Sequence, residues 1–181
     1  MRIIAGHARG RRLRAPDTPG TRPVTDRVKE AVFSSIGEWV EDADVADLYA
    51  GSGSFGLEAL SRGAASAVFV ESGRKALDAL RANVTTLGLG GEVLEMKVQD
   101  YLRRGEGRFH LVFIDPPWDQ ETGMLDADLE MVDAILAPEG EVVVSRRHDD
   151  RPPRPPVTWR VIADKRYGDT RVFRYEKGAT R

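Results

Sequence analysis

The 181-residue sequence contains no cysteine and only three histidines. Without cysteine there are no disulfides, thiolate nucleophiles, cysteine-bound zinc sites or cysteine-ligated iron–sulfur clusters. His7, His110 and His148 lack metal-ligand spacing, so no metal site is expected, and His110 lies in an apolar run where a structural role is expected. No apolar run approaches the roughly 18 residues that would span a bilayer, and the first residues lack an apolar signal region. A cytoplasmic protein is therefore expected.

Charge is unevenly distributed along the chain, although the net charge is only −2. Residues 1–29 contain eight basic and two acidic residues, a net charge of +6, which leaves −8 for the remainder. A hydrophobic content of 41% and a charged content of 31% are typical of a globular domain. A basic segment attached to an acidic body favours a polyanionic partner that this segment contacts.

Glycine and proline interrupt residues 1–25, which predicts an irregular or hairpin-forming arm. Thr25 or Asp26 can cap a helix that runs to about Ile36. Strands and helices then alternate, which predicts a mostly parallel sheet with helices on both faces and a final antiparallel pair of strands. We expect residues 1–38 to form the basic arm and first helix, and residues 39–181 to form an α/β domain. The other expected strands are 45–49, 67–71, 93–98, 141–145, 158–163 and 171–175, and the other helices are 57–62, 74–87 and 125–136.

A glycine-rich turn lies between the first expected strand and the following helix. Gly51, Gly53 and Gly56 form a G-x-G-x-x-G pattern. Small residues let a ligand approach the backbone, and the helix N-terminus supplies unpaired N–H groups. The pattern alone does not distinguish a dinucleotide from S-adenosylmethionine. The turn residues expected to contact the cofactor are Ala50, Gly51, Ser52, Gly53 and Gly56.

Acidic residues occur at or near the ends of the first three expected strands. Glu71 ends the second strand, where a carboxylate can accept hydrogen bonds from ribose hydroxyls. Asp47 lies inside the first strand, where it can order the glycine turn or bind the amino end of a ligand. Asp100 follows the third strand and can accept from an adenine amino group while the N–H of Tyr101 meets a ring nitrogen. The alternative for Asp100 is a helix cap.

The motif Asp115-Pro116-Pro117-Trp118 follows the apolar residues 109–114, which are expected to form a buried strand. Open α/β sheets bind ligands at the carboxyl ends of their strands. Proline fixes φ and has no N–H, so the turn is stiff and its carbonyls are not used in a strand ladder. Rigid acceptors beside an aromatic ring suit a planar group with an exocyclic NH2, such as a nucleobase.

Together these residues resemble the class I S-adenosylmethionine-dependent methyltransferases that methylate exocyclic amino nitrogens of bases. Further stretches are similar to the RsmD family, which methylates N2 of a guanine in 16S ribosomal RNA. Trp118 stands where phenylalanine is also common, and residues 147–156 form a loop that departs from the family pattern. The similar stretches are residues 3–6, 9–13, 22–33, 51–53 and 56–63.

The resemblance implies a Rossmann-like fold with a seven-stranded, mostly parallel sheet, an antiparallel C-terminal strand and a basic N-terminal extension. It implies S-adenosylmethionine as cofactor and 16S rRNA as partner, within a small-subunit assembly particle, with no membrane contact and a monomeric enzyme. Asp115 and the Pro116 carbonyl would hold the target NH2, Pro117 would stiffen the turn, and Trp118 would stack on the base. The residues expected to hold phosphates are Arg9, Arg11, Arg12, Arg14, Arg22 and Arg27.

Three other functions fit part of this pattern. An NAD-dependent oxidoreductase would explain the glycine turn and Glu71, but it leaves the Asp-Pro-Pro-Trp motif and the basic arm without a role. A non-catalytic RNA-binding module could keep the same fold. A DNA adenine-N6 methyltransferase would use the same motif, and only the resemblance of the arm favours ribosomal RNA over it.

Overall fold

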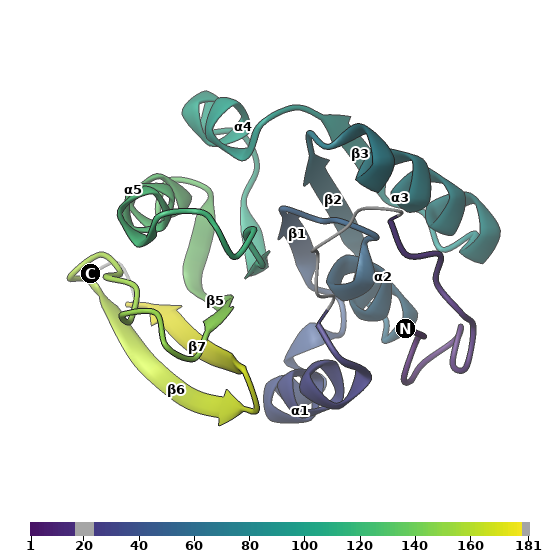
Figure 1. Ribbon diagram of the computed structural model, residues 1–181, viewed down its shortest axis with the longest axis horizontal. Coiled ribbons are helices and arrows are strands. Elements are labelled where there is room, and N and C mark those ends of the chain that lie inside the picture. Colours follow the sequence, from purple (N-terminus) through teal and green to yellow (C-terminus); the bar gives the residue numbers. More distant parts are fainter. Residues whose placement is uncertain (17–23, 179–181) are drawn as a thin grey trace.

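Seven strands form a single sheet in the order β3-β2-β1-β4-β5-β7-β6, as the computed structural model of residues 1–16 and 24–178 shows (Figure 1). The strands are β1 Asp44–Leu48, β2 Ser66–Glu71, β3 Glu92–Glu95, β4 Phe109–Ile114, β5 Leu136–Arg147, β6 Trp159–Tyr167 and β7 Thr170–Lys177. The helices are α1 Asp26–Ile36, the 3-10 helix η1 Gly37–Val40, α2 Ser54–Ser61, α3 Arg74–Leu87, α4 Val98–Arg104 and α5 Thr122–Val132.

Strands β1 to β5 pair in parallel, whereas β7 is antiparallel to both β5 and β6. This confirms the predicted mostly parallel sheet with an antiparallel strand near the C-terminus. The carboxyl ends of β1 to β5 therefore lie at one edge of the sheet. Because Thr170 pairs with Arg147, the turn between β6 and β7 lies at that same edge.

Helices cover both faces of the sheet, with α1, α2 and α3 on one side and α4 and α5 on the other (Figure 1). Side chains alternate between two apolar cores along each central strand. In β4, Leu111 and Phe113 belong to the core beneath the first three helices, and Val112 and Ile114 belong to the other. Burial on both faces explains why β4 has a continuous apolar sequence.

Local signals placed the first and third helices correctly. The Thr25 hydroxyl accepts a hydrogen bond from the N–H of Val28 at 3.3 Å, which caps α1 at the expected position. Gly88 follows the last residue of α3 with φ +64°, a left-handed conformation that glycine adopts without steric cost. Within residues 1–16 and 24–178, no helix is both long and apolar enough to cross a membrane.

Several element boundaries differ from the sequence prediction, and three of the differences bear on the site. The third strand ends at Glu95, and Val98 begins α4. The fourth predicted helix ends at Val132, because Leu136 already pairs with Phe109 of β4 and belongs to β5. Helix α2 begins at Ser54 rather than at residue 57, immediately after Gly53.

Candidate active site

The glycine turn reverses the chain between β1 and α2 through three left-handed residues. Tyr49, Gly51 and Gly53 have φ values of +60°, +58° and +79°. Gly56 is required by packing, because a Cβ atom there would lie 2.4 Å from Cε1 of Phe69 on β2. The turn is therefore shaped partly by backbone conformation and partly by close contact between α2 and the sheet.

Replacing Gly56 by alanine is expected to lower the free energy of unfolding by about 1–3 kcal/mol, because the added methyl group overpacks the Phe69 ring. Gly123 in α5 is the matched control, since its Cβ would meet no heavy atom within 4 Å. Gly123→Ala is expected to stabilise the protein by about 0.5–1 kcal/mol. Urea unfolding measures both changes. Equal effects of the two substitutions would contradict the packing role of Gly56.

Glu71, at the end of β2, connects the glycine turn to the loop before α3. Its carboxylate accepts hydrogen bonds from the N–H groups of Gly51 at 2.9 Å, Ser72 at 2.8 Å and Gly73 at 2.6 Å. A carboxylate has about four acceptor positions, so these three bonds leave capacity for a further donor. The Glu71 carboxylate is thus fixed beside the glycine turn, and its position is compatible with the predicted hydrogen bonds to ribose hydroxyls.

Asp47 lies on β1 directly under the glycine turn and is only 1% exposed. Its Oδ2 accepts a hydrogen bond from the N–H of Gly56 at 2.8 Å. Burial, together with the nearby carboxylates of Asp115 and Glu71, raises the pKa of Asp47 to about 8, against the lowering effect of the Gly56 hydrogen bond. Of the two roles that the sequence allows, ordering the glycine turn is the one for which a contact is present.

Asp115 follows β4, which lies next to β1 in the sheet. Residues 115–118, which we call the acidic corner, therefore lie at the same edge of the sheet as the glycine turn. The Ser145 hydroxyl of β5 donates a hydrogen bond to Oδ1 of Asp115. Among the described residues Oδ2 has no hydrogen-bond partner. Burial raises the pKa of Asp115 to about 6, although Ser145 and Arg146 oppose this shift. One carboxylate oxygen is therefore held in place while the other is available as an acceptor.

The two prolines of the motif have different environments. Pro116 is buried and Pro117 is exposed. The carbonyl of Pro117 accepts hydrogen bonds from the Gln120 N–H at 3.0 Å and from the Arg146 guanidinium at 3.2 Å. The Pro117 carbonyl is thus already engaged, which leaves Asp115 and Pro116 as the acceptors that the motif can offer to a ligand.

The end of β5 supplies three residues to this corner that the sequence interpretation did not identify. Ser145 fixes Asp115, and Arg146, which is 2% exposed, donates to the carbonyls of Pro117 in the motif and Gln120 after it. The guanidinium of Arg147 lies 5.2 Å from the ring centroid of Trp118, in cation–π contact with the half-buried indole. These residues stand at the carboxyl end of a strand, which is where the sequence could have indicated site residues. Their contact with Asp115 and Trp118 follows only from the pairing of β4 with β5.

A partly buried polar cluster joins the glycine turn to the helices on the other face. The hydroxyl of Tyr49 donates to Asp128 of α5 at 2.5 Å, and Asp128 is 1% exposed. Gln99 of α4 donates to the Tyr49 hydroxyl at 2.7 Å, and Gln120 donates to the same oxygen at 3.0 Å. Burial raises the pKa of Tyr49, so its hydroxyl keeps its proton. The cluster holds both loops of the site against α4 and α5, and no local sequence pattern indicated it.

Residues 99–101 lie in α4 rather than in a loop after β3. Asp100 is exposed and forms an ion pair with Arg103 at 2.5 Å. The N–H of Tyr101, which the sequence assigned to a ring nitrogen, instead donates to the Lys97 carbonyl at 3.1 Å, and the Tyr101 side chain is buried in the core. The segment is therefore helical, but Asp100 lies in the first turn of α4 and is not its N-cap, which is Lys97.

The N-terminal arm packs against α2 and α3. Glu58 of α2 accepts from the N–H groups of Ile4 at 2.7 Å and Ala5 at 3.0 Å. Asn83 of α3 donates to the carbonyl of Arg14 at 3.0 Å and to that of Ser52 at 2.9 Å. Asn83 thus links the arm directly to the glycine turn, a contact that the sequence interpretation missed.

Several of the predicted phosphate-binding residues are exposed on this surface. Arg9, Arg12 and Arg14 are exposed there, and Arg27 is exposed on α1, outside the segment that packs on α2 and α3. The Arg11 guanidinium donates to the Thr86 carbonyl at 2.9 Å, which fixes that side chain against α3. Arg22 lies outside the described residues.

Comparisons with known proteins agree with this architecture. The family described as Conserved hypothetical protein 95 matches residues 1–176. The chain is 35% identical to ribosomal RNA small subunit methyltransferase D of Escherichia coli over 182 residues, which cover 99% of this chain and 91% of that protein. It is 34% identical to the Haemophilus influenzae protein of the same name, over 93% of this chain and 89% of that one.

Solved structures show the same fold. The yhhF protein of Escherichia coli has a TM-score of 0.89 and 34% identity, with 99% of each chain covered. SMU.776 of Streptococcus mutans, solved in complex with SAH, has a TM-score of 0.68 and 14% identity, over 79% of this chain and 48% of that one. The chain therefore has the class I methyltransferase fold, and it belongs to the RsmD family, whose members include ribosomal RNA small subunit methyltransferase D.

Proposed function

We propose that this protein is an S-adenosylmethionine-dependent RNA methyltransferase that transfers a methyl group to the exocyclic N2 of a guanine in 16S rRNA. Family membership supports methylation of ribosomal RNA. The observation that carries the chemistry is the shared sheet edge, where the Glu71-bound glycine turn lies beside a fixed Asp115. An oxidoreductase would leave the acidic corner without a role.

The residues at the glycine turn suit S-adenosylmethionine. Glu71 keeps acceptor capacity for a ribose hydroxyl. Gly51 carries no side chain that would block a ligand, since a Cβ atom there would have only the Tyr49 carbonyl oxygen within 4 Å, at 3.9 Å. We propose that Ala50 and Ser52 complete this contact and that Asp100, at the start of α4, accepts from the adenine amino group. The cofactor supplies a sulfonium-activated methyl group when it is bound.

Asp115 and Pro116 would orient the target nitrogen. An exocyclic guanine NH2 is a weak nucleophile because its lone pair is delocalised into the ring. Hydrogen bonds to Asp115 Oδ2 and to the Pro116 carbonyl would draw the nitrogen toward tetrahedral geometry and direct its lone pair at the methyl carbon. Orientation of this kind contributes about 7–11 kcal/mol to barrier reduction in favourable cases. The proton becomes acidic as the nitrogen is alkylated, so Asp115 need not be a strong base.

The value of kcat/KM should fall about tenfold per pH unit below about pH 6, because Asp115 accepts hydrogen bonds from the NH2 group only as a carboxylate. Burial raises its pKa to about 6, so the neutral acid dominates below that pH. Methyl transfer measured from pH 5 to pH 8 tests this, with Asp115→Asn as the variant that should lack the transition. A parent enzyme with constant kcat/KM down to pH 5 would exclude Asp115 as the titrating acceptor.

Replacing Trp118 by alanine should raise the KM for RNA by roughly 5- to 150-fold, because a base stacked on an aromatic ring gains about 1–3 kcal/mol. Affinity for S-adenosylmethionine should stay within twofold, since the glycine turn is on another loop. Trp118→Phe should retain most of the stacking and serves as the control. Steady-state kinetics at limiting RNA measure the effect, and an unchanged KM in the alanine variant would rule out stacking.

We propose that the exposed arginines of the arm hold phosphates of the substrate RNA in a salt-dependent way. Ile3 and Leu13 of the same arm are buried in the core. Removing the arm would therefore remove core side chains together with the positive charges. Arg9 and Arg12 form no ion pair with described residues. Their substitution removes positive charge and leaves the core side chains of the arm in place, so it tests phosphate binding alone.

The proposal extends to the working form of the protein. We propose a cytoplasmic monomer that acts on 16S rRNA within a small-subunit assembly particle, with residues 1–38 contacting RNA and residues 39–181 carrying the cofactor site. The test is calorimetry with S-adenosylmethionine and with NAD, followed by transfer of labelled methyl groups to naked 16S rRNA, assembled small subunits and DNA. Binding of S-adenosylmethionine alone and labelling of small-subunit RNA alone are expected. Binding of NAD alone, or labelling of DNA in preference to RNA, would overturn the proposal.

A further inference from the structure

The turn between β6 and β7 lies beside the acidic corner, although it is distant in sequence. Thr170 pairs with Arg147, and the N–H of His148 donates to the carbonyl of Asp169 at 2.9 Å. Arg147 is the residue that covers Trp118. A nucleic acid whose target base reaches Trp118 therefore passes close to this turn.

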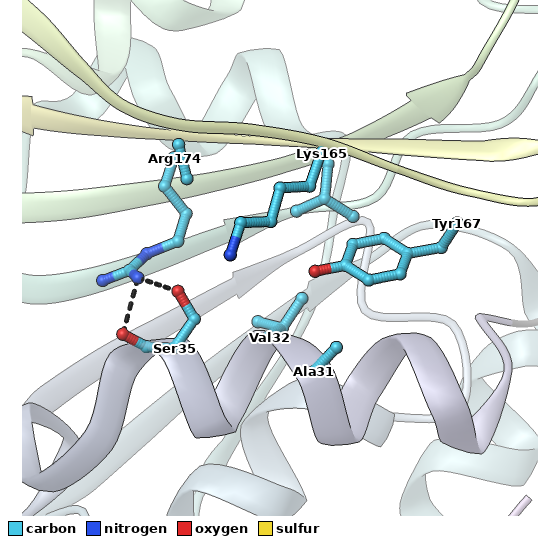
Figure 2. Close-up of a pocket in the computed structure, with 8 residues that line it drawn as sticks. Ala31, Val32, Ser35, Lys165, Tyr167 and Arg174 are labelled. Carbon is cyan, nitrogen blue, oxygen red and sulfur yellow. Dashed lines mark hydrogen bonds between the residues drawn. The ribbon is translucent and has the colours of Figure 1, made fainter.

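A groove runs between α1 and the β6–β7 hairpin toward this turn. Figure 2 shows Lys165 and Tyr167 of the hairpin pointing toward Ala31 and Val32 of α1, with Arg174 bound to Ser35 at the far end. Tyr167 also lines a second hollow, at the start of α1, together with Arg27 and Arg166. The two hollows share Tyr167, and the second is lined by turn residues 168–170 at the site edge of the sheet.

The positive charges in these hollows and on the neighbouring strand β7 are of two kinds. Arg171 is paired with Asp164 at 2.7 Å, and Arg174 is paired with Glu141, so both are neutralised. Lys165, Arg166 and Arg27 form no ion pair with any residue in the described part of the chain, and the Arg166 guanidinium donates only to the Gly168 carbonyl at 2.9 Å. The acidic residue that lines the groove is Asp169. Three cations that form no ion pair with described residues thus gather where α1 meets the β6–β7 hairpin.

We infer that Lys165, Arg166 and Arg27 form a second RNA-contact surface, which holds backbone phosphates flanking the target guanine. This inference rests on the proposed function. The arm lies along α2 and α3, and Figure 1 places α1 between the arm and the β6–β7 turn. RNA gripped by the arm alone would be held on the cofactor side of the acidic corner. The second surface holds it on the other side, so that the base between them is presented to Asp115.

Charged residues on an edge strand can also serve only to prevent strand pairing, and β6 is an edge strand. A role in preventing strand pairing and a role in binding phosphates predict different RNA affinities after the charges are removed. The double variant Lys165→Gln/Arg166→Gln should weaken binding of a labelled 16S rRNA fragment by roughly tenfold at low salt, and it should make the log–log salt dependence less steep by about 1–2. Its affinity for S-adenosylmethionine should match the parent.

Arg160→Gln is the matched control, because Arg160 lies on the same strand at the opposite edge of the sheet and is paired with Glu176 at 2.7 Å. It should bind RNA as the parent does. Arg27→Gln changes a different element and should reproduce part of the loss even if changes in the edge strand cause aggregation. If the parent protein methylates RNA and the double variant binds the rRNA fragment with the same affinity and salt dependence as the parent, this inference alone is overturned. A parent that neither binds nor methylates RNA would overturn the proposed function with it.

Discussion

Replacing Asp115 by alanine should lower the rate of methyl transfer by on the order of 10³-fold, because it removes an acceptor that orients the target nitrogen in the transition state. The substitution also leaves the Ser145 hydroxyl without the carboxylate it binds. The glycine turn and Glu71 are untouched, so the Kd for S-adenosylmethionine should stay within about twofold. Single-turnover transfer of a labelled methyl group and calorimetry measure the two quantities separately.

Asp119 supplies the matched control for this experiment. It is an exposed carboxylate in the same loop, four residues after Asp115. Asp119→Ala should leave the rate within about twofold of the parent, since surface substitutions of this kind are usually mild. If Asp115→Ala retained more than a tenth of the parental rate, or lost activity only in parallel with cofactor affinity, the acceptor role would be rejected.

The second large effect is expected at Glu58, whose replacement by alanine should lower the free energy of unfolding by about 3–5 kcal/mol. Glu58 and Lys29 are fully buried, with Oε2 of Glu58 3.3 Å from Nζ of Lys29. The change leaves the Lys29 ammonium without its carboxylate and takes the acceptor from the N–H groups of Ile4 and Ala5. Burial lowers the pKa of Lys29, and Glu58 opposes that shift, so the pair depends on both members.

Urea unfolding of Glu58→Ala beside Glu95→Gln tests this account. Glu95 forms a comparable ion pair with Arg81 at 2.8 Å, but both side chains are exposed. Loss of an exposed pair costs about 0–1 kcal/mol. Because Glu58 anchors the arm, its loss should also weaken RNA binding more than cofactor binding. Similar unfolding free energies for the two variants would show that the buried pair does not hold the arm.

Elements whose signals are local were predicted well from the sequence. Thr25 caps α1 and Gly88 ends α3, because caps act through neighbouring backbone groups. The boundary between β3 and α4 was wrong for a physical reason. Leu94 and Val98 contribute to the same core, one from a strand and one from a helix, so the apolar pattern alone did not separate them.

The same distinction holds for the site. Asp47, Glu71 and Asp115 stand at strand positions that a parallel sheet brings together, so the motif spacing was sufficient to propose them. Ser145 was not predicted, because its contact with Asp115 depends on the pairing of β5 with β4. Asn83 was missed because its link to Ser52 requires α3 to pack against both the arm and the glycine turn.

Nuclease digestion of the methylated RNA, followed by mass spectrometry of the nucleosides, tests the central claim most directly. A corner that presents an exocyclic guanine amine to an activated methyl group predicts N2-methylguanosine at a single position of 16S rRNA. It also predicts that the initial yield of this nucleoside falls as far as the rate does when Asp115 is alanine. N6-methyladenosine, a methyl group on a ring carbon, or unchanged N2-methylguanosine in the alanine variant would contradict it.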